Sequence, residues 1–288
     1  MVSPILKIEE IVSKTKDLPT IPAAALAVMR ESESATCSAA SIAKHIMQDQ
    51  GLSARILRLA NSAFYGLNRQ VTTPQDAVVI LGIRTVRNLA MVAASYPWMS
   101  KPIKGYVLGP KEMWAHGLGV AVGAQMIATR TKKACPDLTF ISGLLHDLGK
   151  VALAIWLEAR SQTMLKLAVQ ENLTFDEVER KILGFDHCDV GGYLAEQWNL
   201  PSSLGRAMRY HHNPLAMETP DHSVECIHIG DYMAMAVGLG IGVDGLRYEL
   251  QYECLESLGL SESEFEEIFA GFPEKFHEYE EMFSLLND

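Results

Sequence analysis

The sequence lacks the features that would place a protein outside the cytoplasm or in a membrane. It has only five cysteines in 288 residues, and no two of them form a Cys-x-x-Cys pair. Such scattered cysteines are typical of reduced thiols and argue against a disulfide framework or a zinc knuckle. The N-terminus has no signal-peptide pattern, and no apolar run approaches the length that spans a bilayer. We therefore expect a cytoplasmic protein with no membrane partner.

Positive charge is also scarce. The chain has 25 Lys and Arg against 35 Asp and Glu, which gives a net charge of -10 at pH 7. Because nucleic-acid binding depends on neutralising phosphates, this balance argues against a nucleic-acid partner. Arg84 and Arg87 follow Gly82, an order that could be interpreted as part of a DNA-binding helix-turn-helix. Without a basic cluster around them, a solvated helix face is the better interpretation.

Apolar residues recur at spacings of three and four almost throughout, while strict alternation is rare. This periodicity predicts an all-α protein. A hydrophobic content of 48% with 21% charged residues is typical of a globular chain, and the length allows a substantial core. One helix start is clear: Thr73 can cap, Pro74 suits the first position, Asp76 follows in the first turn, and Gly82 marks the end.

Helix breakers divide the chain. Between Tyr96 and Pro110 prolines and glycines are frequent, which indicates a connection between helical units. We therefore predict an N-terminal helical half at 1–105, a second helical half at 106–250 and acidic amphipathic helices at 251–288. Pro273 is expected to split this last segment into two helices. The Phe residues of this segment can line one side of the helices. This apolar side is interpreted either as part of the core or as a homodimer contact.

A His-Asp pair, His146 and Asp147, lies inside the apolar run Gly143–Lys150, which is expected to form one helix through the pair. Imidazole and carboxylate both suit a divalent metal, and ionisable groups in such a segment need a partner. Further candidates are His116 upstream and His187, His211, His212 and Asp231 downstream. The alternatives are a hydrogen-bonded His-Asp pair that only orders helices, and loop or helix-capping histidines. In the His211-His212 pair, we expect only one ring to face such a site.

These residues resemble the His…His-Asp…Asp pattern of the HD superfamily of metal-dependent phosphohydrolases. The positions that match are His116, His146, Asp147 and Asp231, and His146–Lys150 resembles the extended HDxGK motif. The wider chain is similar to the HDOD branch over about residues 15 to 240. The segments that carry this likeness are Leu18–Pro22, Ile46–Leu52, Arg55–Ser62, Ala77–Gly82, His187–Gly191, Trp198–Pro201 and His211–Pro214.

The resemblance implies a multi-helix HD-type bundle with a helical N-terminal subdomain. It also implies that one or two divalent metal ions, Fe or Mn, are held by His116, His146, Asp147, His187, His211, His212 and Asp231. HDOD domains are usually signalling output modules, so a regulatory protein with a signalling partner or a small phosphorylated ligand is the leading hypothesis.

An active phosphohydrolase acting on a nucleotide or cyclic dinucleotide is the alternative. There, Asp147 would bridge two metals and Lys150 would steady a phosphate oxygen as the catalytic residues. The related HD-GYP domains, which hydrolyse cyclic di-GMP, carry Gly-Tyr-Pro shortly after a paired histidine. Here Asn213-Pro214 follow His212, which argues against that substrate. His228, three residues before Asp231, is expected to be a core or supporting histidine.

Overall fold

The computed structural model describes residues 7–14, 21–240 and 248–287. Over these ranges the chain is all-α, as predicted, with one isolated antiparallel bridge between Ile103 and Leu108 and no strand. The motif residues Leu18, Pro19 and Thr20 lie outside the described part. The chain forms two compact units, one of residues 1–18 and 100–273 and the other of residues 19–99 and 274–288.

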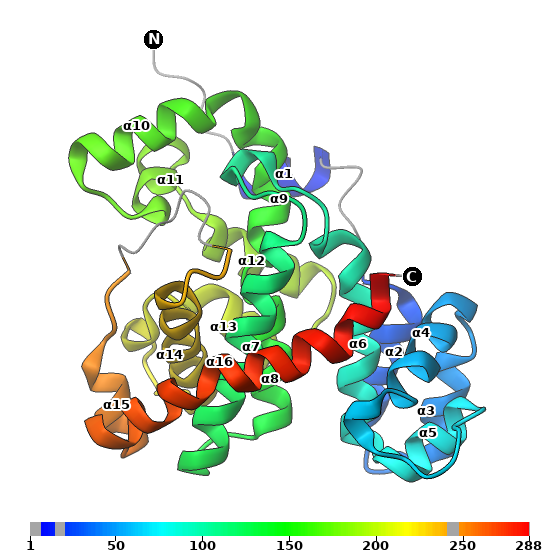
Figure 1. The fold of residues 1–288 in the computed structure, drawn as a ribbon. Helices are drawn as coiled ribbons and strands as arrows, with labels where there is room; N and C mark the ends of the chain where they lie inside the picture. The colour runs from blue at the N-terminus through cyan, green and yellow to red at the C-terminus, as the bar shows by residue number, and fades with distance from the viewer. Residues whose placement is uncertain (1–6, 15–20, 241–247, 288) are drawn as a thin grey trace. The chain divides into compact units, whose positions relative to one another are not determined.

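The unit of residues 19–99 and 274–288 is a helical bundle (Figure 1). Its elements are α2 (Ala23–Ser32), α3 (Ala39–Ile46), α4 (Gln50–Ala60), η1 (Ala63–Tyr65), α5 (Pro74–Leu81), α6 (Ile83–Met99), the end of α16 (Glu262–Ser284) and η5 (Leu285–Asn287). Helix α5 begins as predicted, with the Asp76 backbone N–H donating to the Thr73 hydroxyl, and Gly82 ends it at a φ of 87°.

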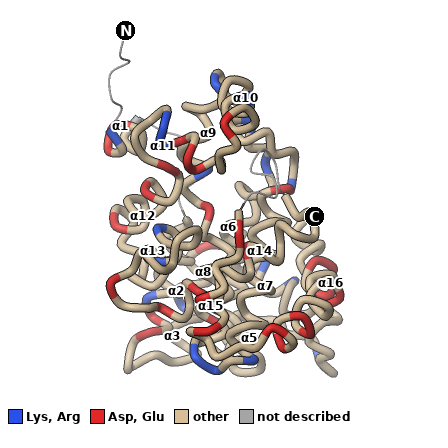
Figure 2. Tube along the Cα trace, turned by 90° about the vertical axis from the view of Figure 1, so that its left-hand side faces the viewer, with Lys and Arg blue, Asp and Glu red and all other residues tan. Residues whose placement is uncertain are grey.

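Two predictions for this part of the chain are wrong. Arg84 is exposed, as expected, but Arg87 is buried because α6 packs against α2 and α4. Helix α16 continues through Pro273 as a single helix. Phe272 and Phe276 on either side of this proline are buried, and packing of that apolar face outweighs the backbone hydrogen bond that proline cannot make. Figure 2 shows that Asp and Glu recur along α16, as the acidic sequence predicts.

The other unit contains the segment 106–250 that is predicted as the second helical half. Its elements are α1 (Ile8–Lys14), η2 (Lys104–Tyr106), α7 (Glu112–Thr131), α8 (Pro136–Leu145), α9 (Leu148–Leu157), η3 (Glu158–Arg160), α10 (Ser161–Glu171), α11 (Phe175–Leu183), α12 (His187–Gln197), α13 (Ser202–Tyr210), η4 (Pro214–Ala216), α14 (His222–Ala236), α15 (Tyr252–Leu258) and most of α16.

Helix α7 is the centre of this unit and packs against α8 and α14. Gly230 of α14 allows a very close approach, because a Cβ there would lie only 2.7 Å from the backbone nitrogen of Ala124. This backbone contact holds the two helices together along the faces that carry His116 and Asp231.

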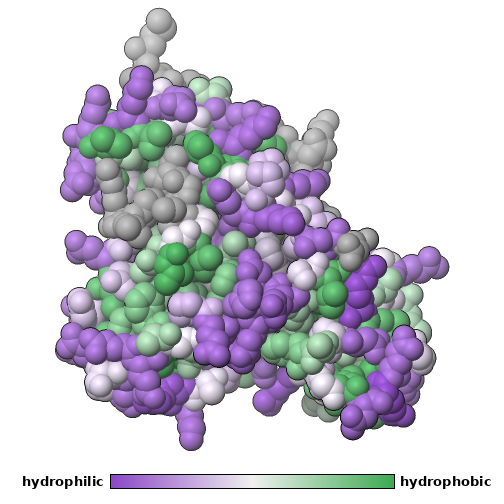
Figure 3. Space-filling view, in the orientation of Figure 1, coloured by the Kyte–Doolittle hydropathy of each residue, from purple (hydrophilic) through white to green (hydrophobic). Residues whose placement is uncertain are grey.

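Within the stretch Pro136–Glu171, an 18-residue window is apolar enough to cross a membrane, with a mean hydropathy of 1.4, but 78% of that window is buried inside the protein. Helices α8 and α9 of this stretch therefore form core. On the face drawn in Figure 3, apolar residues form small patches between hydrophilic ones. The stretch Pro136–Glu171 is not one continuous helix, because His146 and Asp147 form a turn between α8 and α9. The prediction of one helix through this pair is wrong.

Candidate metal centre

All seven predicted metal ligands lie in one cluster, and six of them are buried, with His212 almost so. They come from separate elements: His116 from α7, His146 and Asp147 from the turn between α8 and α9, His187 from the start of α12, His211 and His212 from the end of α13, and Asp231 from α14. The turn matters because adjacent residues on a helix point about 100° apart. Leaving the helix lets both His146 and Asp147 face one site.

Asp147 stands at the middle of this cluster. Its Oδ2 lies 3.4 Å from the His146 Nε2 and 3.6 Å from the His116 Nε2. Its Oδ1 lies 3.5 Å from the His187 Nε2 and 3.6 Å from the His211 Nε2. Two ligands at about 2.1 Å from one metal lie about 3.4 Å apart at a tetrahedral angle. Each carboxylate oxygen is therefore spaced to share a metal with its own pair of histidines.

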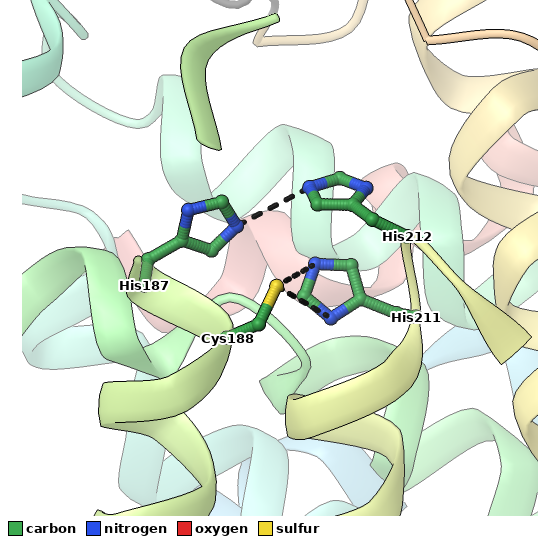
Figure 4. A group of neighbouring side chains, drawn as sticks. All are labelled: His187, Cys188, His211 and His212. Carbon is green, nitrogen blue, oxygen red and sulfur yellow. Dashed lines mark hydrogen bonds between the residues drawn. The ribbon is translucent and has the colours of Figure 1, made fainter. Parts of the chain in front are cut away.

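Asp231 and His212 complete the two groups. The Asp231 Oδ1 lies 3.2 Å from the His116 Nε2, while its Oδ2 lies 3.4 Å from the His212 Nδ1. The His212 Nε2 is 3.2 Å from the His187 Nε2 (Figure 4). Contrary to the sequence-based expectation, both rings of the His211-His212 pair face the cluster, because they lie where α13 ends.

The outer nitrogens of four histidines are held by fixed oxygens. The His116 Nδ1 lies 3.1 Å from the Leu239 carbonyl, and the His146 Nδ1 lies 2.6 Å from the Gly143 carbonyl. The His187 Nδ1 lies 2.8 Å from the Glu179 Oε2, and the His211 Nδ1 lies 3.1 Å from the Met208 carbonyl. An Nδ1 that donates to oxygen leaves the inner Nε2 as an electron-pair donor, which is the tautomer that binds metals.

Three atoms that face the cluster have no hydrogen-bond partner among the described residues: the His146 Nε2, the Asp147 Oδ1 and the Asp231 Oδ1. Leaving a buried polar atom unsatisfied costs about 1–3 kcal/mol, more for a charged group. A cation at each of the two positions would satisfy all three atoms. The donor set of imidazoles and carboxylates therefore fits divalent metal ions.

Lys150 adds a buried positive charge to the cluster. Its Nζ lies 2.9 Å from the Asp147 Oδ2 and 5.7 Å from the centre of the Tyr106 ring. Lys150 is thus buried, and it is not a surface lysine at the end of a helix. Burial alone would raise the pKa of Asp147, but the positive charge of Lys150 holds that pKa well below its usual value. Asp147 is thus a carboxylate at neutral pH.

Cys188 lies beside the second group but faces the wrong way to share a metal with His211. Its sulfur is 4.0 Å from the Nδ1 and 3.8 Å from the Nε2 of His211, so it stands nearly level with both nitrogens (Figure 4). The electron pair of the Nε2 points toward Asp147 instead. Burial raises the pKa of the Cys188 thiol to about 12, so it packs against the ring as a neutral thiol.

The sequence matches the HDOD domain family over residues 18–214. The chain belongs to the HDOD family. An uncharacterised protein of Treponema pallidum (strain Nichols) is 27% identical over 207 residues, which span 70% of this chain and 39% of that protein. The present chain thus matches about two fifths of that relative.

Solved structures share the fold. An HDOD domain protein of unknown function from Geobacter sulfurreducens is 27% identical, with a TM-score of 0.68 over 93% of this chain and 96% of that one. A proposed signal transduction protein from Marinobacter aquaeolei VT8 is 23% identical, with a TM-score of 0.76 over 96% of this chain and 61% of that one.

Two residues that contact the cluster of predicted metal ligands do not belong to the family motifs. One is Glu179, which is fully buried on α11, and the helical pattern of the sequence indicates its burial. Phe175, Val178, Ile182 and Leu183 define the apolar face of that helix, and Glu179 falls on the same face. Tyr248 stacks on His212 with ring centres 4.1 Å apart, and nothing in the sequence indicates that contact.

His228 has the supporting role that the sequence predicts. Its Nδ1 donates to the His211 carbonyl at 2.9 Å, and its Nε2 accepts from the Gln251 backbone N–H at 3.0 Å. Both ring nitrogens are therefore used outside the cluster.

Metal binding is expected to strengthen as pH rises. Burial would lower the pKa of His116 and of His187, but Asp231 and Asp147 raise the pKa of His116, and Glu179 raises the pKa of His187 well above its ordinary value. Burial and His146 instead lower the pKa of His211 to about 3. Each ligand group thus contains one histidine that must release a proton before it binds a metal.

At pH values below the raised pKa of His116 or His187, we expect the metal affinity of the corresponding position to rise about tenfold for each pH unit of increase. About one proton should be released for each metal bound. Calorimetric titration of the metal-free protein in buffers of different ionisation enthalpy, between about pH 6 and pH 8, measures both quantities. Affinity that does not change with pH would contradict this assignment of the protons.

Proposed function

We propose that this protein is a cytoplasmic HDOD signalling protein whose HD-type half holds two divalent metal ions, Fe or Mn, bridged by Asp147. One observation carries the proposal: the two oxygens of Asp147 face two different groups of histidine nitrogens. His116, His146 and Asp231 would hold one ion, and His187, His211 and His212 the other. All five cysteines are free thiols in the structure, which is consistent with a reducing compartment.

The signalling role is supported by the family and by the fold shared with the Marinobacter aquaeolei protein. In this role the protein acts through a signalling partner or a small phosphorylated ligand, and the metals hold the HD-type half in one conformation. Ligands bound only by the native state stabilise it, so metal supply would set the stability of that half.

A metal-dependent phosphohydrolase acting on a nucleotide or cyclic dinucleotide is the second candidate, and the complete donor set with its buried lysine favours it. Bound divalent ions would supply a polarised phosphate and a water of lowered pKa. The chain itself would contribute Asp147 as a fixed carboxylate between the two metal positions. Lys150 would add a positive charge beside it that offsets phosphate charge.

Elemental analysis of the purified, tag-free protein tests the proposal. We expect about two equivalents of metal per chain, and almost none in an Asp147→Asn variant. Less than half an equivalent after anaerobic reconstitution with iron or manganese would contradict it. If two equivalents are found, a screen with cyclic dinucleotides, nucleotides and generic phosphodiesters separates the two roles. Turnover that disappears in the folded Asp147 variant indicates the enzyme, and no turnover favours the regulatory protein.

A further inference from the structure

Glu179 is a buried carboxylate that faces the cluster without being one of its ligands. Its side chain is 0% exposed. Its Oε2 lies 2.8 Å from both the Nδ1 and the backbone nitrogen of His187, so it accepts two hydrogen bonds from one residue. The ring of His187 and the first turn of α12 are therefore held by the same oxygen.

The other oxygen of Glu179 is held as firmly. The hydroxyl of Tyr106, which is fully buried at the end of η2, donates to the Glu179 Oε1. Gly105 packs so closely on α9 that a Cβ there would lie 2.5 Å from the Ala154 carbonyl oxygen. Val107, the next residue after Tyr106, has a φ of 57°, which is strained for a β-branched side chain. The loop keeps a costly conformation that places the Tyr106 hydroxyl on Glu179.

We propose that Glu179 is a positioning residue for the second metal position, and that Tyr106 fixes it in place. The inference rests on the proposed metal centre. Glu179 would set the tautomer and ring angle of His187, and its charge would make that imidazole a stronger ligand. His116 and His146 of the first group donate instead to neutral carbonyl oxygens. Loss of Glu179 should therefore weaken the second position and spare the first.

The test is a titration of the metal-free protein with Co²⁺, in which visible absorption and bound equivalents are recorded. In Glu179→Gln, which keeps the size and one acceptor oxygen but removes the charge, the second equivalent should bind about tenfold more weakly than in the wild type. In Glu179→Ala the loss should approach about a hundredfold. The first equivalent should bind unchanged in both variants. Tyr106→Phe should show a smaller loss at the second position only.

Glu225 offers a matched control. It is buried and its Oε2 lies 2.8 Å from the Nδ1 of His222, a histidine outside the cluster. Glu225→Gln thus removes a similar His-carboxylate pair and should leave both equivalents unchanged.

The outcomes are distinct. If the wild type binds no Co²⁺, the metal centre itself is wrong. If the wild type binds two equivalents and Glu179→Gln binds both equally well, only the role of Glu179 is overturned. Equal weakening of both equivalents in Glu179→Gln would also overturn it, because a merely structural role affects the whole fold. If Glu179→Ala does not fold, the Gln variant decides.

Discussion

Replacing Asp147 with asparagine is expected to abolish binding of both metal ions and to lower the free energy of unfolding by about 3–5 kcal/mol. The substitution removes a carboxylate whose two oxygens face two different ligand groups. It also leaves the ammonium of Lys150 without the counter-charge that lies 2.9 Å away in a buried site. Metal analysis and urea denaturation of the metal-free protein measure the two effects separately.

The double variant Asp147→Asn/Lys150→Met is the control. It also replaces the buried Lys150 ammonium with an apolar side chain, so most of the lost stability should return, while the metal sites stay empty. Stability that remains equally low in the double variant would show that the Asp147–Lys150 pair is not the source of the loss.

Gly149→Ala is expected to be the most disruptive single-methyl change in the HD-type half. A Cβ at Gly149 would lie 1.9 Å from the His187 carbonyl oxygen and 2.8 Å from the Gly191 backbone nitrogen. Both obstacles are backbone atoms of α12, so α9 and α12 must separate. We expect a loss of about 3 kcal/mol or more, at the upper end of overpacking effects, together with weaker metal binding as His187 shifts.

Gly271→Ala is a suitable comparison for this change. Gly271 also lies within a helix, but the nearest atom to its added Cβ is the Met126 Cε at 3.9 Å. Because alanine favours helix by about 0.5–1 kcal/mol over glycine, this variant should be slightly more stable than the wild type. Thermal and urea unfolding of both variants check the pair, and a mild effect at Gly149 would mean that α9 and α12 pack less closely than described.

The sequence predicts which residues lie together in the cluster, because His146 and Asp147 belong to a motif whose other members can be recognised along the chain. It also predicts the start of α5, where the capping chemistry of Thr73 is local. It does not predict the turn at His146 and Asp147, since an apolar run without glycine or proline at that point has no local sign of a break. Tertiary packing decides that turn.

The same limit explains the other errors. Packing around α6 buries Arg87, and packing on both sides of Pro273 carries α16 through a residue that local rules would make a helix end. Glu179 is a different case, since its place on an apolar helix face was visible in the sequence. A charged residue at such a position indicates a buried partner, and the partner is His187, eight residues away.

The ligands of the cluster are spread from His116 to Asp231, with no short segment that contains a full set. During synthesis, a chain that has not yet extended past Asp231 lacks a ligand of the first group, although most of the helices have emerged. Domains generally fold as units while they leave the ribosome. The proposed ions would therefore enter late, into a nearly finished protein, because the first group stays incomplete until α14 has emerged.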